Sequence, residues 1–240
     1  MSASKQGQTG RLPRKESMLA TQLPLFPLGT VLFPGMVLPL HIFEQRYRTM
    51  IARRMNEDPM FGVVLARSGR EVGEQPEIVD IGTAASLVEA VRYDDGRFDI
   101  AVRGGRRFNV VGSNWDEGYL TGTIEWLRDP DLLTPGGAEA TRLANHVRHA
   151  FDVYLDAFER ATDVRVKRAE LGNDPVEMAY AICSMMPFDT HRRQHLLEAP
   201  TSERLLEDLL AMLRRDRELL VSTGIGGANI DHPGTRFSSN

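Results

Sequence analysis

Cysteine is nearly absent from this sequence, since Cys183 is the only one among 240 residues. A single cysteine excludes an internal disulfide and suits a reducing compartment, so we expect a cytoplasmic protein. Apolar runs are also short, and none reaches the roughly 18 residues that a membrane-spanning helix needs. Residues 1–17 carry positive charge without an apolar segment, which predicts neither a signal peptide nor a membrane partner.

Motifs of nucleotide chemistry are missing as well. No GxxxxGK[ST] phosphate-binding loop occurs, and beyond the N-terminal segment the only lysine is Lys167. This excludes the ATPase and Ser-Lys protease chemistries from the sequence in hand. We therefore expect no enzyme, no catalytic residue and no cofactor.

Two further patterns could indicate a hydrolase or a metal site, and each has a structural explanation. A small-molecule hydrolase could use Cys183 or Ser184, but free cysteine is usually buried and Ser184 has no base nearby in the sequence. His191 and His195 lie four residues apart on one predicted helix face. Zinc needs three or four protein ligands and no third ligand follows, so we predict no metal site.

The charge is distributed unevenly along the chain. The net charge is −4, with +3 over residues 1–17, −2 over 18–128 and −5 over 129–222. A protein that binds a phosphate backbone needs a basic face. We therefore expect no nucleic-acid partner, although this balance leaves room for a local basic patch.

The most informative segment is Leu23–Tyr47, which is apolar yet interrupted by four prolines. Proline removes a backbone donor, so this segment is neither a helix nor an ordinary central strand. We predict short strands at 22–25 and 36–41, joined by a loop with a type II turn at Pro34-Gly35. Helical spacing of apolar residues then predicts a helix over 44–56.

Short strands with frequent turn signals continue to residue 128. Asp94-Asp95-Gly96 predicts a hairpin, and Gly104-Gly105 predicts a second turn. Such spacing is typical of a small barrel or sandwich built as a meander. The predicted strands are 60–67, 79–93, 97–102, 107–111 and 119–127.

Beyond a Pro- and Gly-containing boundary at 128–137, the periodicity becomes helical. Asp174-Pro175 is a strong helix start, because aspartate caps free N–H groups and proline suits the first helical position. The predicted helices are 138–161, 174–186, 191–198 and one from Thr201 or Ser202 to Leu220. The polar segments 1–17 and 223–240 are predicted to be disordered.

The order of several motifs resembles the Lon substrate-binding (LON N-terminal) domain. They are LPLFPLGTVLFPGMVLPLHIFEQRYR from Leu23, FGVVL from Phe61, REVG from Arg70, IGTAASL from Ile81, GGRRF from Gly104, DPVEMAYAICSMMPFD and LLEAPTSERLLEDLL. The resemblance implies an α+β fold with an N-terminal PUA-like β pseudobarrel over 18–128 and an α-helical domain over 129–222. The HIFEQRYR ending is similar to stand-alone LON-domain proteins.

The family implies non-catalytic recognition of unfolded or apolar polypeptide, as an adaptor or modulator in protein quality control that works with a protease or chaperone. The proline-rich loop is too apolar for a plain surface loop, so it joins the core or leaves an apolar groove. We expect Phe26, Phe33, Met36 and Arg46 to contact peptide. The alternative is an RNA-binding PUA-like module, whose contacts would be Arg103, Arg106 and Arg107.

Overall fold

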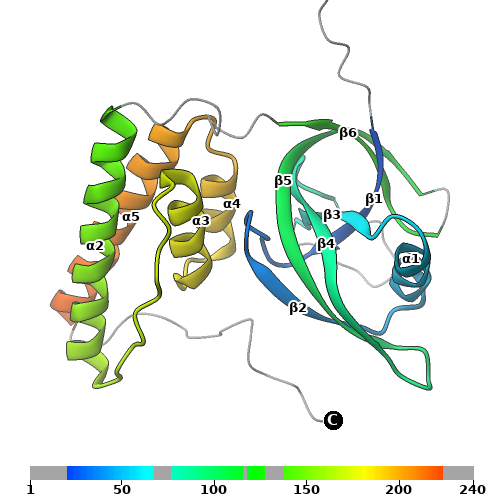
Figure 1. Cartoon of the computed structure of the whole chain (residues 1–240), viewed down its shortest axis with the longest axis horizontal. Coiled ribbons are helices and arrows are strands. Elements are labelled where there is room, and N and C mark those ends of the chain that lie inside the picture. Colours follow the sequence, from blue (N-terminus) through cyan, green and yellow to red (C-terminus); the bar gives the residue numbers. More distant parts are fainter. Residues whose placement is uncertain (1–20, 68–76, 116–117, 128–137, 224–240) are drawn as a thin grey trace, which may run out of the picture.

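The computed structural model describes residues 21–67, 77–115, 118–127 and 138–223. A β pseudobarrel is followed by an α-helical part, which confirms the α+β class (Figure 1). The PUA-like type and the division into 18–128 and 129–222 stay predictions, since the junction 128–137 lies outside the described residues. The REVG motif and the predicted tails also lie outside the described residues, except for Thr223, which is the last residue of a helix. None of the described helices is long and apolar enough to span a membrane.

Six strands form one sheet that closes on itself. The order is β2-β5-β4-β3-β1-β6, and an additional pairing of β5 with β6 closes the ring and leaves β2 as an extra strand. Because β1 and β3 run parallel, the sheet is not the simple meander that we predicted. The strands are β1 (Thr21–Leu28), β2 (Val37–Ile42), β3 (Met60–Leu65), β4 (Ile81–Arg92), β5 (Phe98–Asn114) and β6 (Thr121–Trp126).

Strand β1 accommodates two prolines because each of its halves has a partner strand on one side. Residues 21–24 pair with β6, whereas residues 25–28 pair with β3. A residue paired on one side can lack a donor on the other side without breaking a ladder. The strand is therefore longer than the predicted 22–25.

Strand β5 corrects the prediction of a turn at Gly104-Gly105. It runs without a break through both glycines, pairing first with β2 and then with β6 while β4 follows its other edge. A Cβ placed on Gly104 would lie 2.1 Å from the carbonyl oxygen of Phe33. Glycine at this position thus permits a close approach of two backbones, which is the other common reason for glycine in a strand.

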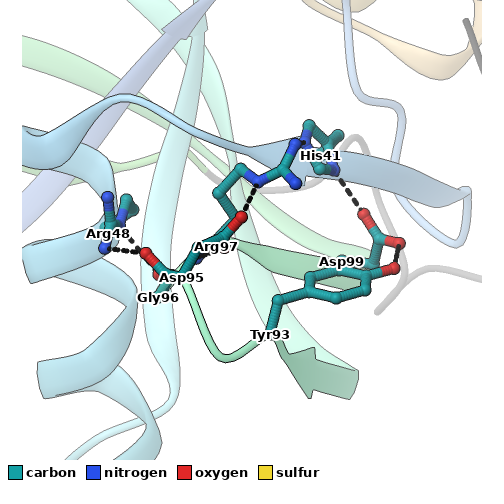
Figure 2. A network of polar contacts seen from close by, with 7 residues as sticks. All are labelled: His41, Arg48, Tyr93, Asp95, Gly96, Arg97 and Asp99. Atoms are coloured by element: carbon teal, nitrogen blue, oxygen red, sulfur yellow. Dashed lines mark hydrogen bonds and ion pairs between the residues drawn. The ribbon is translucent and has the colours of Figure 1, made fainter. Parts of the chain in front are cut away.

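Helix α1 (Gln45–Asn56) packs its buried residues against the strands of the barrel and is held there by an arginine. The Arg48 guanidinium donates to the carbonyl oxygens of Asp95 (2.6 Å) and Gly96 (2.8 Å) in the β4–β5 hairpin (Figure 2). Gly96 has φ +82°, which confirms the predicted hairpin, and a Cβ there would collide with this guanidinium. Arg48 therefore has a structural role, seating α1 on the barrel.

The same hairpin is tied to β2 through Asp99. One carboxylate oxygen accepts from Tyr93 Oη (2.5 Å), and the other lies 2.6 Å from His41 Nδ1 (Figure 2). The hydrogen bond from Tyr93 is the largest cause that lowers the pKa of the Asp99 carboxyl, and the hydrogen bond with His41 is the next. The hairpin is thereby held by polar contacts at its base as well as by Arg48 at its tip.

Four helices form the second part: α2 (Ala138–Thr162), α3 (Pro175–Met185), α4 (Thr190–Leu197) and α5 (Ser202–Thr223). Their positions confirm the predicted helices to within a few residues. The Asp174 carboxylate accepts from the backbone N–H groups of Val176 and Glu177, as the capping pattern predicts. Helices α3 and α4 lie toward the barrel, whereas α2 and α5 lie on the far side (Figure 1).

Candidate functional site

A groove of about 580 Å³ lies where the barrel meets helix α3. Its lining is mainly apolar and comes from three segments that are far apart in the sequence. These are the turn at residues 34–36, the middle of β5 at residues 104–106, and the α3 residues Val176, Glu177, Tyr180, Ala181 and Ser184.

The turn that forms the first wall is locked onto β5. Met36 N–H donates to the Phe33 carbonyl (3.1 Å) and Gly35 has φ +78°, which confirms the predicted turn at Pro34-Gly35. Gly104 then donates to the Met36 carbonyl and accepts from Gly35 N–H, both at 2.9 Å. The wall therefore holds its shape through backbone hydrogen bonds.

The β5 edge beside this wall is incompletely paired. The β2 ladder ends at Arg103 and the β6 ladder begins at Phe108, while Leu127 N–H donates to the Arg107 carbonyl. Within the part of the chain that the structure describes, no strand covers this edge at residues 105–106. The groove thus combines apolar side chains with a short length of β5 edge that no described strand pairs.

Two buried arginines fix the helices against the barrel. Arg107 of β5 donates to the carbonyl oxygens of Leu197 (2.5 Å), the last residue of α4, and Ala199 (2.9 Å), just beyond it. Arg193 of α4 donates to the carbonyl oxygens of Val31 and Cys183, both at 3.2 Å. Each guanidinium therefore joins segments that are distant in the sequence.

Arg193 also supports the groove from behind. Its guanidinium carbon lies 4.9 Å from the centre of the Phe33 ring, and Nη2 lies 3.6 Å from Met36 Sδ. Burial lowers the pKa of this guanidinium. Nothing in the sequence marks Arg193 as a buried residue, because it lies in a polar stretch of a short helix.

The predicted peptide-contacting residues do not lie together. Met36 lines the groove, whereas Phe26 and Phe33 are 7% and 0% exposed and offer little surface for the peptide contact that we expected of them. The Phe26 ring packs 4.2 Å from that of Tyr47 inside the barrel. Both rings are large, so turning either one outward would leave a cavity in the packed core. The core explanation considered for this loop therefore holds for both.

Arg46 lies on α1, outside the groove. Its Nε and Nη2 donate to the Glu44 carboxylate at 2.9 and 2.6 Å. The guanidinium carbon lies 4.7 Å from the centre of the Tyr47 ring and 5.7 Å from that of Trp115. A role of Arg46 in peptide contact would thus require a second surface.

The three arginines of the RNA alternative point to different surroundings. Arg107 is buried at 2% exposure, which corrects the expectation of an exposed turn. Arg103 donates to the Gly35 carbonyl (3.3 Å), and Arg106 lines the groove while its guanidinium lies 5.1 Å from the Trp126 ring centre. The three therefore form no common basic face.

The residues weighed for catalysis occupy structural positions. Cys183 is fully buried, which raises the pKa of its thiol to about 12, and Ser184 Oγ donates to the Tyr180 carbonyl (2.8 Å). His195 lies 2.9 Å from the Asp208 carboxylate. No group of three or more metal-ligating side chains gathers in the described ranges.

Residues 22–215, which include every segment of the groove, match the family model of the ATP-dependent protease La (LON) substrate-binding domain. The chain belongs to this family. It is 26% identical over 86% of its length to Lon protease 2 of Syntrophobacter fumaroxidans, and 27% identical over 87% to Lon protease of Anaeromyxobacter dehalogenans. These matches span about a quarter of each curated relative, 26% and 25%.

Solved structures of this family share the fold. The Lon N-terminal domain protein from Xanthomonas campestris aligns with a TM-score of 0.58 and 27% identity, over 80% of this chain and 98% of that one. The N-terminal domain of the Mycobacterium avium complex Lon protease aligns with a TM-score of 0.59 over 81% and 98%. At 18% identity, the second likeness concerns the fold alone.

Proposed function

We propose that this LON-family chain is a non-catalytic recognition protein that binds extended, apolar segments of unfolded polypeptide in the groove between the barrel and α3. The observation that carries the proposal is the mainly apolar groove, whose wall includes β5 residues 105–106 at an edge that no described strand pairs. An extended peptide can add main-chain hydrogen bonds to such an edge. Its apolar side chains would be buried against Met36, Tyr180 and Ala181.

The family supports the same role, since its description is a substrate-binding domain. We further propose that the chain acts in the cytoplasm as an adaptor or modulator in protein quality control, presenting clients to a protease or chaperone. The groove itself offers no activated nucleophile, because Ser184 Oγ donates to a backbone carbonyl. Binding without cleavage is the chemistry that these side chains can perform.

The test compares two glutamates placed on the same helix. Ala181 lines the groove, whereas Met185 is 41% exposed and does not. Fluorescence anisotropy with labelled, reduced and carboxymethylated α-lactalbumin would measure binding of an unfolded polypeptide. We expect Ala181→Glu to weaken it by about tenfold or more, because a charge is placed where apolar surface is buried.

The matched variant Met185→Glu should change the affinity by less than about twofold. Circular dichroism must show that both variants are folded. Equal affinities for the two variants would place the binding surface elsewhere, and no binding by the wild type would refute the proposed function. RNA recognition is the alternative outcome: a single-stranded oligonucleotide should then bind with steep salt dependence, since phosphate contacts release counterions.

A further inference from the structure

A second concave surface lies between α2 and α5. These two helices lie on the far side of the helical part from the barrel (Figure 1). Its volume is about 180 Å³, and four of its six lining residues are basic. They are His146 and His149 from α2, and Arg214 and Arg217 from α5. The remaining lining residues, Ala150 and Val153, give it an apolar floor.

The four basic residues are arranged compactly. Within each helix the two lie three residues apart, so they share one face within a single turn. The groove brings the two faces together, and all four side chains are exposed. Four donors therefore surround one small volume.

Several other arginines of the helical part have carboxylate partners. Arg142 donates to Glu139 at 2.5 Å, Arg192 pairs with Asp216 at 2.9 Å, and Arg204 pairs with Asp208 at 2.9 Å. The four groove residues form no hydrogen bond or ion pair within residues 138–223.

Nearby acids do not change this picture. Glu139 is already bonded to Arg142, and this hydrogen bond is the largest cause that lowers the pKa of the Glu139 carboxyl. Glu218 follows Arg214 by four residues, yet in the described helices no ion pair joins them. The groove keeps this unpaired positive charge although residues 129–222 carry a net charge of −5.

We propose that the α2–α5 groove is a binding site for a compact, multiply charged oxyanion of the phosphate class. Arginine and protonated histidine donate charge-assisted hydrogen bonds to phosphoryl oxygens. The volume is below the roughly 300–1,000 Å³ of pockets that hold drug-sized organic ligands, so it fits one or two phosphate groups. This site is separate from the peptide groove and does not depend on the proposed function.

Isothermal titration calorimetry of the whole chain tests the proposal, with inorganic pyrophosphate, inorganic phosphate and glycerol 3-phosphate as probes at equal ionic strength. We expect the double variant Arg214→Gln/Arg217→Gln to bind the preferred probe at least about tenfold more weakly than the wild type. The control Arg142→Gln/Arg215→Gln removes the same charge from the same helices outside the groove. It should change the affinity by less than about twofold.

The probes also identify the source of the phosphoryl group. Tighter binding of pyrophosphate would indicate a free oligophosphate, whereas tighter binding of glycerol 3-phosphate would indicate an esterified phosphate; either result supports the site. The proposal is refuted if the wild type binds none of the probes, or if the two double variants lose affinity equally. Equal losses would reveal a nonspecific effect of net charge.

Discussion

The ring of Phe33 stacks on that of Tyr180, with the ring centroids 5.9 Å apart and the planes inclined by 29°. Phe33 comes from the proline-rich loop of the barrel and Tyr180 from α3, and both are buried. The helical core thus extends into the barrel loop. Because the groove lies beside this contact, its shape depends on the barrel and the helices being docked together.

Replacing the buried ring of Phe33 should lower the stability of the fold far more than replacing an exposed ring. We expect Phe33→Ala to lower the free energy of unfolding by about 3–5 kcal/mol, through lost burial and the cavity left behind. Phe43→Ala, at a ring that is 62% exposed, should cost less than about 1 kcal/mol. Urea denaturation followed by circular dichroism measures both. Similar values for the two variants would contradict the packing.

The two adjacent glycines of β5 should respond differently to alanine. A Cβ on Gly104 would lie 2.1 Å from the Phe33 carbonyl oxygen, so Gly104→Ala should cost about 1–3 kcal/mol as the turn is pushed away. A Cβ on Gly105 meets its nearest atom, the Ala84 carbonyl oxygen, at 3.5 Å. Gly105→Ala should therefore stay within about 0.5 kcal/mol of the wild type in the same denaturation assay.

Arg107 should behave as a structural residue. Arg107→Leu removes the donor from the buried carbonyl oxygens of Leu197 and Ala199, and we expect a loss of about 2–4 kcal/mol. Arg103→Leu, at an exposed side chain with one 3.3 Å bond, should cost less than about 1 kcal/mol. Thermal unfolding would compare the stabilities of the two variants, each of which loses one positive charge. A larger effect at Arg103 would argue against the interface.

The single thiol should be inert in the folded protein. With the pKa of Cys183 raised by burial to about 12, the thiolate fraction near pH 8 is on the order of 10⁻⁴. A disulfide reagent should therefore label the protein only as it unfolds, at a rate that follows urea concentration. Rapid stoichiometric labelling without denaturant would show that the thiol is accessible.

The same shift has a consequence for stability at high pH. The folded pKa lies above the unfolded value of 9.0, so folded protein holds this proton more tightly. The contribution is fully present below about pH 9 and is lost at about 1.4 kcal/mol per pH unit above it. Cys183→Ala should flatten the decline of stability between about pH 9 and 12.

Local chemistry in the sequence was sufficient to predict much of the fold. The turn at Pro34-Gly35, the hairpin at Gly96 and the helix start at Asp174 all depend on the φ preferences or capping groups of adjacent residues. The order of the family motifs predicted the α+β class and the helical second part. These features need no knowledge of distant contacts.

Tertiary structure decided everything that depends on partners far along the chain. Gly104 signals a turn by itself, but it lies within a strand because the Phe33 backbone approaches it. The sequence left the loop of Phe33 between the core and an open groove, and the packing of Tyr180 against the ring decided for the core. Arginine is charged wherever it stands, and Arg107 and Arg193 are buried only because carbonyl groups of other segments accept from them. Burial is a property of the packed whole, so the groove at residues 34–36, 104–106 and along α3 emerged only when the barrel and helices were placed together.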